Sequence, residues 1–119
     1  DKIDLSDLDL RLKETELRLI YDVAIPLTGE KGATVNYSRQ KGACDDMVAK
    51  LENGMKHYAD VIHRTYNTDP DNIPGTGAAG GLGCGLMMAG GILTEGAPYM
   101  LKLTGFSRLA KKCDVIITG

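Results

Sequence analysis

The feature that most constrains this sequence is the stretch 73–101, which contains nine of the 15 glycines and one charged residue, Glu95. Most other charged residues lie in residues 1–72. A segment this long without charge is typical of a membrane span or of an element buried in a protein core. Only six residues between Gly75 and Thr94 are strongly apolar, which is too few to drive insertion into a bilayer. We therefore expect a helix buried against a sheet, with glycines that allow close approach.

Length and charge narrow the classes of function. The 119 residues suffice for one domain, and 14 basic against 16 acidic side chains give a pI of about 5.6. Nucleic acid binding needs a surplus of positive charge, so we expect no nucleic acid partner. The three cysteines form no C-x-x-C motif, and the opening residues lack the apolar core of a signal peptide. We expect a reduced, cytoplasmic setting, with all three cysteines as small buried apolar residues.

Hydrophobic periodicity predicts an α/β fold, a small sheet with packed helices in which residues 1–119 form a single piece. The clearest helix is 45–64, because its apolar residues recur at three- and four-residue steps. These residues are Met47, Val48, Leu51, Met55, Tyr58, Ala59 and Ile62. The other expected elements are a turn or short helix at 6–9 capped by Ser6, strands at 17–23 and 115–117, a turn at 69–72, a glycine-rich helix at 77–91 and a short helix at 107–112.

The run from Gly75 to Gly80 matches G-x-G-x-x-G. Dinucleotide binding requires a strand directly before such a run, and the Asp- and Pro-rich residues 69–74 cannot form a central strand. No G-K-[ST] follows any glycine run, which excludes a Walker loop. A glycine-rich turn entering a helix can still present amide groups to an anion. The candidates are Gly75, Gly77, Gly80 and Gly81, and the alternative is that these glycines serve only packing.

Two loops contain further candidates. Gln40 and Lys41 lie just before the long helix, where a lysine can hold a phosphate or carboxylate or can simply be solvated. Asp22 follows the first predicted strand, a position that suits a metal ligand, a proton acceptor or a turn-capping residue. His57 and Asp60 lie one helical turn apart. This spacing is compatible with a pair of metal ligands or with a solvated helix face.

Five blocks of the sequence together resemble the class I glycerate kinase family. In order, they are Asp22-Val23-x-x-Pro26-Leu27, Gly29-x-x-Gly32-Ala33, Gln40-Lys41-Gly42-Ala43, Pro74-Gly75-x-Gly77-Ala78-Ala79-Gly80-Gly81-x-Gly83 and Asp114-x-Ile116-Ile117-Thr118-Gly119. Their order and spacing agree along almost the whole chain. Ile25 departs from the pattern, because the family usually has asparagine there.

The resemblance implies an ATP- and Mg²⁺-dependent kinase of two α/β lobes that phosphorylates D-glycerate, to 2-phosphoglycerate in the bacterial branch. On this reading the chain is the middle portion of the enzyme, an incomplete part of the smaller lobe, and is inactive by itself. Asp22 and Lys41 would be catalytic, with Asp22 also a metal ligand, and Gln40, Gly75, Gly77, Gly80 and Gly81 would bind substrate or phosphate. Glycerate and nucleotide would be the partners, with no membrane involved and the oligomeric state open. The alternatives are a noncatalytic lobe that binds small anions and a purely structural lobe.

Overall fold

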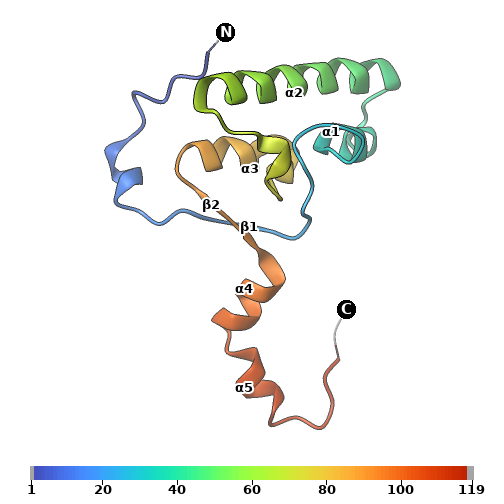
Figure 1. Cartoon of the computed structure of the whole chain (residues 1–119). Helices are drawn as coiled ribbons and strands as arrows, with labels where there is room; N and C mark the ends of the chain where they lie inside the picture. Colours follow the sequence, from blue (N-terminus) through green and yellow to red (C-terminus); the bar gives the residue numbers. More distant parts are fainter. Residues whose placement is uncertain (1, 118–119) are drawn as a thin grey trace.

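The structure, a computed structural model, describes residues 2–117 and is organised around a two-stranded parallel sheet (Figure 1). β1 (Arg18–Tyr21) pairs with β2 (Ile92–Glu95), in a register that sets Arg18 opposite Ile92 and Tyr21 opposite Glu95. Parallel strands need a crossover connection between them. The elements in this crossover are α1 (Ala33–Tyr37), η2 (Arg39–Lys41), α2 (Asp45–Tyr66), η3 (Pro70–Asn72) and α3 (Ala78–Met88). Outside it lie η1 (Leu10–Lys13), α4 (Gly96–Leu103) and α5 (Phe106–Ala110).

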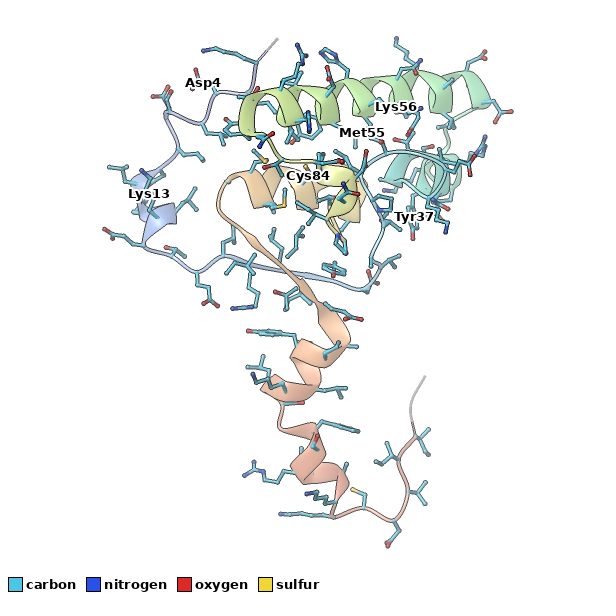
Figure 2. The ribbon with its side chains drawn as sticks, viewed as in Figure 1. Asp4, Lys13, Tyr37, Met55, Lys56 and Cys84 are labelled. Atoms are coloured by element: carbon cyan, nitrogen blue, oxygen red, sulfur yellow. The ribbon has the colours of Figure 1, made fainter. Side chains whose placement is uncertain are left out.

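The core lies where α2 packs on α3. Leu27, Ile62 and Cys84 are fully buried there, and Met55 and Met87 pack against them. Figure 2 shows Met55 directed from α2 toward α3. Because α3 also contacts both strands, it forms the middle layer between α2 and the sheet (Figure 1). This confirms the expected glycine-rich helix packed against a sheet.

The long amphipathic helix is confirmed as α2, with one revision of its buried face. Asp45 and Asp46 lie in its first turn, where the helix dipole favours negative charge. Met47 and Leu51, expected on the apolar face, are about half exposed, while the carboxylate-bearing Glu52 is buried. In the first half of α2 the buried face therefore contains Val48 and Glu52 in place of Met47 and Leu51.

The glycine-rich helix begins with an unusual backbone. Ala79, Gly80 and Gly81 all have left-handed φ values, of 52°, 74° and 96°. Further along, a Cβ on Gly83 would lie 2.5 Å from the carbonyl oxygen of Gly75. The glycines of α3 thus allow both a tight turn and close backbone contact.

Several expected elements differ in the structure. The strand predicted at 115–117 is wrong: these residues form no strand, and Ile117 is 94% exposed. A strand needs a neighbour to satisfy its backbone hydrogen bonds, and the described part of the chain offers this segment none. β2, α1 and α4 were not expected. The turn expected at 6–9 is present, because Ser6 and Asp7 form a turn in which the Leu8 amide donates to the Leu5 carbonyl over 3.3 Å. Ser6 caps no helix; Asp9 caps η1 by accepting a hydrogen bond from the Arg11 amide.

The C-terminal helices extend away from the rest of the molecule (Figure 1). α4 and α5 contact each other, and only α4 contacts the sheet appreciably. The radius of gyration is 17.5 Å, whereas a compact chain of this length would have about 13.5 Å. Within the residues described, no helix combines the length and apolar character that crossing a bilayer requires.

The cysteines behave differently from one another. Cys84 is buried in the core, as expected for all three, but Cys44 and Cys113 are exposed. Cys44 precedes α2 as its N-cap residue, and Cys113 follows α5, away from the core. The expectation of a small buried apolar role is therefore confirmed only for Cys84.

Candidate functional site

Three segments that are distant in the sequence meet around a cleft of about 320 Å³. One wall is the loop that follows β1, the second is the end of α1 with η2, and the third is the left-handed turn of α3. The lining residues are Asp22, Val23, Ile25, Tyr37, Gln40, Lys41, Ala78, Ala79 and Gly80. The structure thus brings together four of the predicted site residues: Asp22, Gln40, Lys41 and Gly80.

Asp22 reaches the cleft because it is the first residue after β1. The carboxyl ends of parallel strands are where open α/β sheets usually place ligands. Close packing fixes the end of this strand: a Cβ on Gly96 would lie 2.9 Å from the Tyr21 carbonyl oxygen. The next turn is also tight, since the Ile25 amide donates to the Val23 carbonyl over 2.9 Å. Asp22 itself is exposed.

Gln40 and Lys41 are presented by η2. This short helix ends at Gly42, whose φ of 97° is left-handed, so the chain turns sharply there. The Arg39 side chain forms an ion pair with Asp45 at the start of α2, at 3.0 Å. Lys41 is exposed, and no carboxylate among the described residues lies within ion-pair distance of it. Its ammonium group is therefore available to an anion.

The glycine run is mostly used for packing. A Cβ on Gly77 would lie 2.1 Å from the Pro26 carbonyl oxygen, one on Gly75 would meet the Tyr21 ring at 2.5 Å, and one on Gly81 would meet Met55 at 2.8 Å. In the described part of the chain, none of these three lines the cleft.

Backbone hydrogen bonds within the chain use the amides that were expected to meet an anion. The Gly77 amide donates to Ile25, and the amides of Gly80 and Gly81 both donate to the Gly77 carbonyl, at 3.1 and 3.3 Å. The packing alternative thus accounts for Gly75, Gly77 and Gly81, and binding by them stays a prediction. Gly80 lines the cleft, and a Cβ there would meet nothing within 4 Å.

Five lining residues of the cleft were not predicted as site residues, and two of them, Tyr37 and Ala79, are informative. Tyr37 lies at the end of α1 (Figure 2), and it lines the cleft together with Gln40. The short helix that positions it was not expected, although the spacing of three residues between Tyr37 and Gln40 is a helical one. Ala79 has a left-handed φ of 52°, an uncommon conformation for a residue other than glycine. Nothing in the sequence signals that conformation.

The structure offers few metal ligands. Among the described residues, no three of His, Cys, Asp and Glu lie close enough together to hold a metal ion. Asp22 is the one carboxylate of the cleft. His57 and Asp60 lie on the exposed face of α2, where Asp60 pairs with Arg64 at 2.9 Å. A metal held by His57 and Asp60 would find no third protein ligand among residues 2–117.

A second, larger cavity of about 550 Å³ lies between the N-terminal segment and the end of α3. It contains none of the predicted site residues, and several leucines line it. Its one carboxylate, on Asp9, is bound by Arg11. Ser6, Lys13 and Thr15 line this cavity as well, so its polarity does not distinguish it from the cleft. The cleft is the candidate site because the predicted residues Asp22, Gln40, Lys41 and Gly80 meet there.

Comparison with known proteins gives consistent results. The family model described as the glycerate kinase family matches residues 1–119. The chain is 40% identical over 119 residues to a glycerate kinase of Halalkalibacterium halodurans, and 39% identical over 118 residues to glycerate 2-kinase of Escherichia coli K12. These alignments cover 99% and 98% of this chain but 31% of each relative. The chain therefore spans about a third of the length of these curated relatives.

A solved structure agrees with the sequence matches. A crystal structure from Salmonella typhimurium LT2, provisionally assigned as glycerate kinase 2, superposes with a TM-score of 0.78 at 36% identity. The superposition covers 86% of this chain and 28% of that one.

Proposed function

Since the chain belongs to the glycerate kinase family, we propose that it supplies part of the substrate cleft of an enzyme that phosphorylates D-glycerate with ATP. The observation that carries this proposal is the meeting of Asp22 and Lys41, from two different segments, at one cleft. The volume of about 320 Å³ lies at the small end of ligand sites and suits a small hydroxy acid. On this proposal the chain is part of the smaller of two lobes.

Phosphoryl transfer depends mainly on positioning and on neutralising charge, and the cleft residues suit both tasks. The Lys41 ammonium group would hold anionic oxygens of the phosphate or of the glycerate carboxylate. Asp22 would accept the proton of the attacking glycerate hydroxyl. Gln40 and Tyr37 would offer hydrogen bonds that orient the substrate, and Gly80 leaves room for a ligand to approach the backbone.

The described lining of the cleft offers a single carboxylate, Asp22, as a ligand for Mg²⁺. Kinase sites bind Mg²⁺ through one or two carboxylates together with substrate phosphates, and Asp22 offers one such carboxylate. When bound, the ion would neutralise charge on the phosphate oxygens. Asp22 is thus proposed as a ligand of a nucleotide-bound ion, with most ligands coming from elsewhere.

The proposed product is 2-phosphoglycerate. Support comes from the Escherichia coli relative, which is named as a glycerate 2-kinase and is 39% identical over 118 residues. The competing possibilities are a noncatalytic lobe that binds small anions and a structural lobe. Calorimetry separates these two, because only the first binds glycerate or Mg-ATP without turnover.

The test uses a chimera in which this chain replaces the aligned 118 residues of the Escherichia coli enzyme. Asp22→Asn is expected to lower kcat by about 100-fold or more, as loss of a general base does. Lys41→Ala is expected to raise the KM for a substrate and to lower kcat. Lys50→Ala, at an exposed position of α2, is the control and should leave both constants unchanged. Parental kcat and KM in both cleft variants would refute the proposal.

A further inference from the structure

One short loop links two walls of the cleft. Residues 26–32, called here the connecting loop, run from the segment that carries Asp22 to α1 and η2, which carry Tyr37 and Lys41. A displacement of this loop would therefore move one wall relative to the other. Within the loop the Gly32 amide donates to Gly29 over 2.9 Å, and at its far end the Asn36 side chain in α1 donates to the Gly32 carbonyl over 3.0 Å.

Asp71, in η3, holds the connecting loop from outside. One of its carboxylate oxygens, Oδ1, accepts from the Thr28 amide over 2.7 Å, and the other, Oδ2, accepts from the Thr28 hydroxyl over 2.6 Å. Thr28 is 9% exposed, so both hydrogen bonds are largely shielded from water. Hydrogen bonds to a carboxylate are short and strong, and two of them fix both the position and the orientation of Thr28.

Glu52, in α2, holds the next residue of the loop. Its Oε1 accepts from the Gly29 amide over 2.7 Å. The side chain is buried, with 8% of the residue exposed, and Lys56, on the surface of α2 (Figure 2), approaches Oε1 only to 3.8 Å. The second oxygen, Oε2, is buried and has no hydrogen-bond partner in the described structure.

The buried carboxylate of Glu52 fixes the position of Gly29 at a cost to the stability of the fold. A buried carboxylate with an unpartnered oxygen destabilises a fold, and the hydrogen bond that Glu52 accepts from the Gly29 amide offsets only part of this cost. The gain from Glu52 is the fixed location of Gly29. We propose that Glu52 and Asp71 are positioning residues of the cleft, which fix the connecting loop so that Asp22 and Lys41 face the same substrate. This inference rests on the proposed function.

The experiment uses the chimeric kinase with substitutions at Glu52. Glu52→Met removes the carboxylate and keeps the volume, so we expect kcat to fall at least 10-fold, because small misplacements of reacting groups are costly to catalysis. Loss of the acceptor for the Gly29 amide and removal of the unpartnered oxygen have opposite effects on stability, so the thermal midpoint should stay close to that of the parent. Glu52→Gln should recover most of the kcat, because its amide oxygen can still accept from Gly29. A parental kcat in Glu52→Met, or parallel falls in kcat and thermal midpoint, would overturn the proposal.

A second pair of variants decides the matter if Glu52→Met does not fold. Thr28→Val removes the hydroxyl bonded to Asp71 without changing the side-chain shape, whereas Thr28→Ser keeps the hydroxyl. We expect Thr28→Val to lower kcat several-fold and Thr28→Ser to keep a kcat near that of the parent. Equal kcat values in the two variants would overturn the role of Asp71.

If Asp22→Asn and Lys41→Ala leave kcat and KM at the parental values, the proposed function fails. If those two variants lose activity while the Glu52 and Thr28 variants do not, only the positioning role fails.

Discussion

Because Gly77 has no side chain, the start of α3 can pack directly against the segment that carries Asp22. The Gly77 amide donates to the Ile25 carbonyl over 3.1 Å, and a Cβ would lie 2.1 Å from the Pro26 carbonyl oxygen. A contact that short is impossible without moving backbone. One residue thus supplies both a hydrogen bond and the space that brings two cleft walls together.

Cys84, at the centre of the core, is expected to make stability depend on alkaline pH. Burial raises the pKa of its thiol, against an opposing hydrogen bond from Tyr58, and burial also raises the pKa of the Tyr58 hydroxyl. The native state therefore keeps a thiol proton that the unfolded chain loses above about pH 8.5. The contribution of Cys84 to stability should be constant below that pH and should fall as the pH rises toward 10.

The urea midpoint of the chimera is measured at pH 7, 8.5 and 10 and compared with that of the Cys84→Ala variant. The midpoint of the variant should fall less between pH 8.5 and 10. Thiol labelling read by mass spectrometry is the second readout: the exposed Cys44 and Cys113 should react far faster than Cys84. Equal labelling rates at the three cysteines would contradict the buried position of Cys84.

At the scale of elements, α2 was predicted well and β2 was not. The amphipathic period of α2 runs over many turns and reports burial directly. β2 has four residues, Ile92–Glu95, and follows a glycine-rich helix without a polar break. By contrast, Val115, Ile116 and Ile117 have strong strand propensity, but none of residues 2–117 forms a strand beside them. Propensity alone cannot supply the neighbour that a strand requires.

The left-handed start of α3 leads to a prediction at two adjacent positions. Ala79→Gly should raise the free energy of unfolding by about 1 kcal/mol, and Gly80→Ala should lower it by a similar amount, because left-handed backbone penalises a Cβ. A Cβ on Gly80 would meet nothing within 4 Å, so sterics with neighbours do not contribute. Urea denaturation of the chimera measures both changes.

Gly54→Ala is the matched control for this turn. Gly54 lies within the regular helix α2, and its Cβ would also meet nothing within 4 Å. Alanine there should stabilise the protein by roughly 0.5–1 kcal/mol. If Gly80→Ala stabilised the protein as Gly54→Ala does, the turn would not be left-handed.

At the scale of the whole molecule, apolar surface gathers on the C-terminal arm, α4 and α5 with residues 111–117. Leu103 is 66% exposed and Val115 is 74% exposed. The two strands form a sheet with both outer edges unpaired in the described residues, and exposed edges promote association. The fold is therefore expected to need a covering partner.

We accordingly expect the 119-residue chain, purified alone, to bind a hydrophobic dye, to self-associate and to show no ADP formation with glycerate and ATP. Light scattering, dye fluorescence and a coupled kinase assay measure the three properties. Leu103→Asp and Val115→Asp should reduce dye binding. Thr65→Asp, at an exposed polar position, is the control and should leave dye binding unchanged. A dye-silent monomer with kinase activity would contradict this expectation.

The sequence by itself determined the α/β class, the long helix α2 and the glycine-rich helix α3, because periodicity and glycine content are local properties. It also indicated Asp22, Gln40, Lys41 and Gly80, which the tertiary structure brings to one cleft. Only the tertiary structure decided which backbone and side chains Gly75, Gly77 and Gly81 pack against and that Glu52 is buried. Those outcomes depend on which backbone approaches each residue, and contacts between distant segments leave no periodic trace in a single sequence.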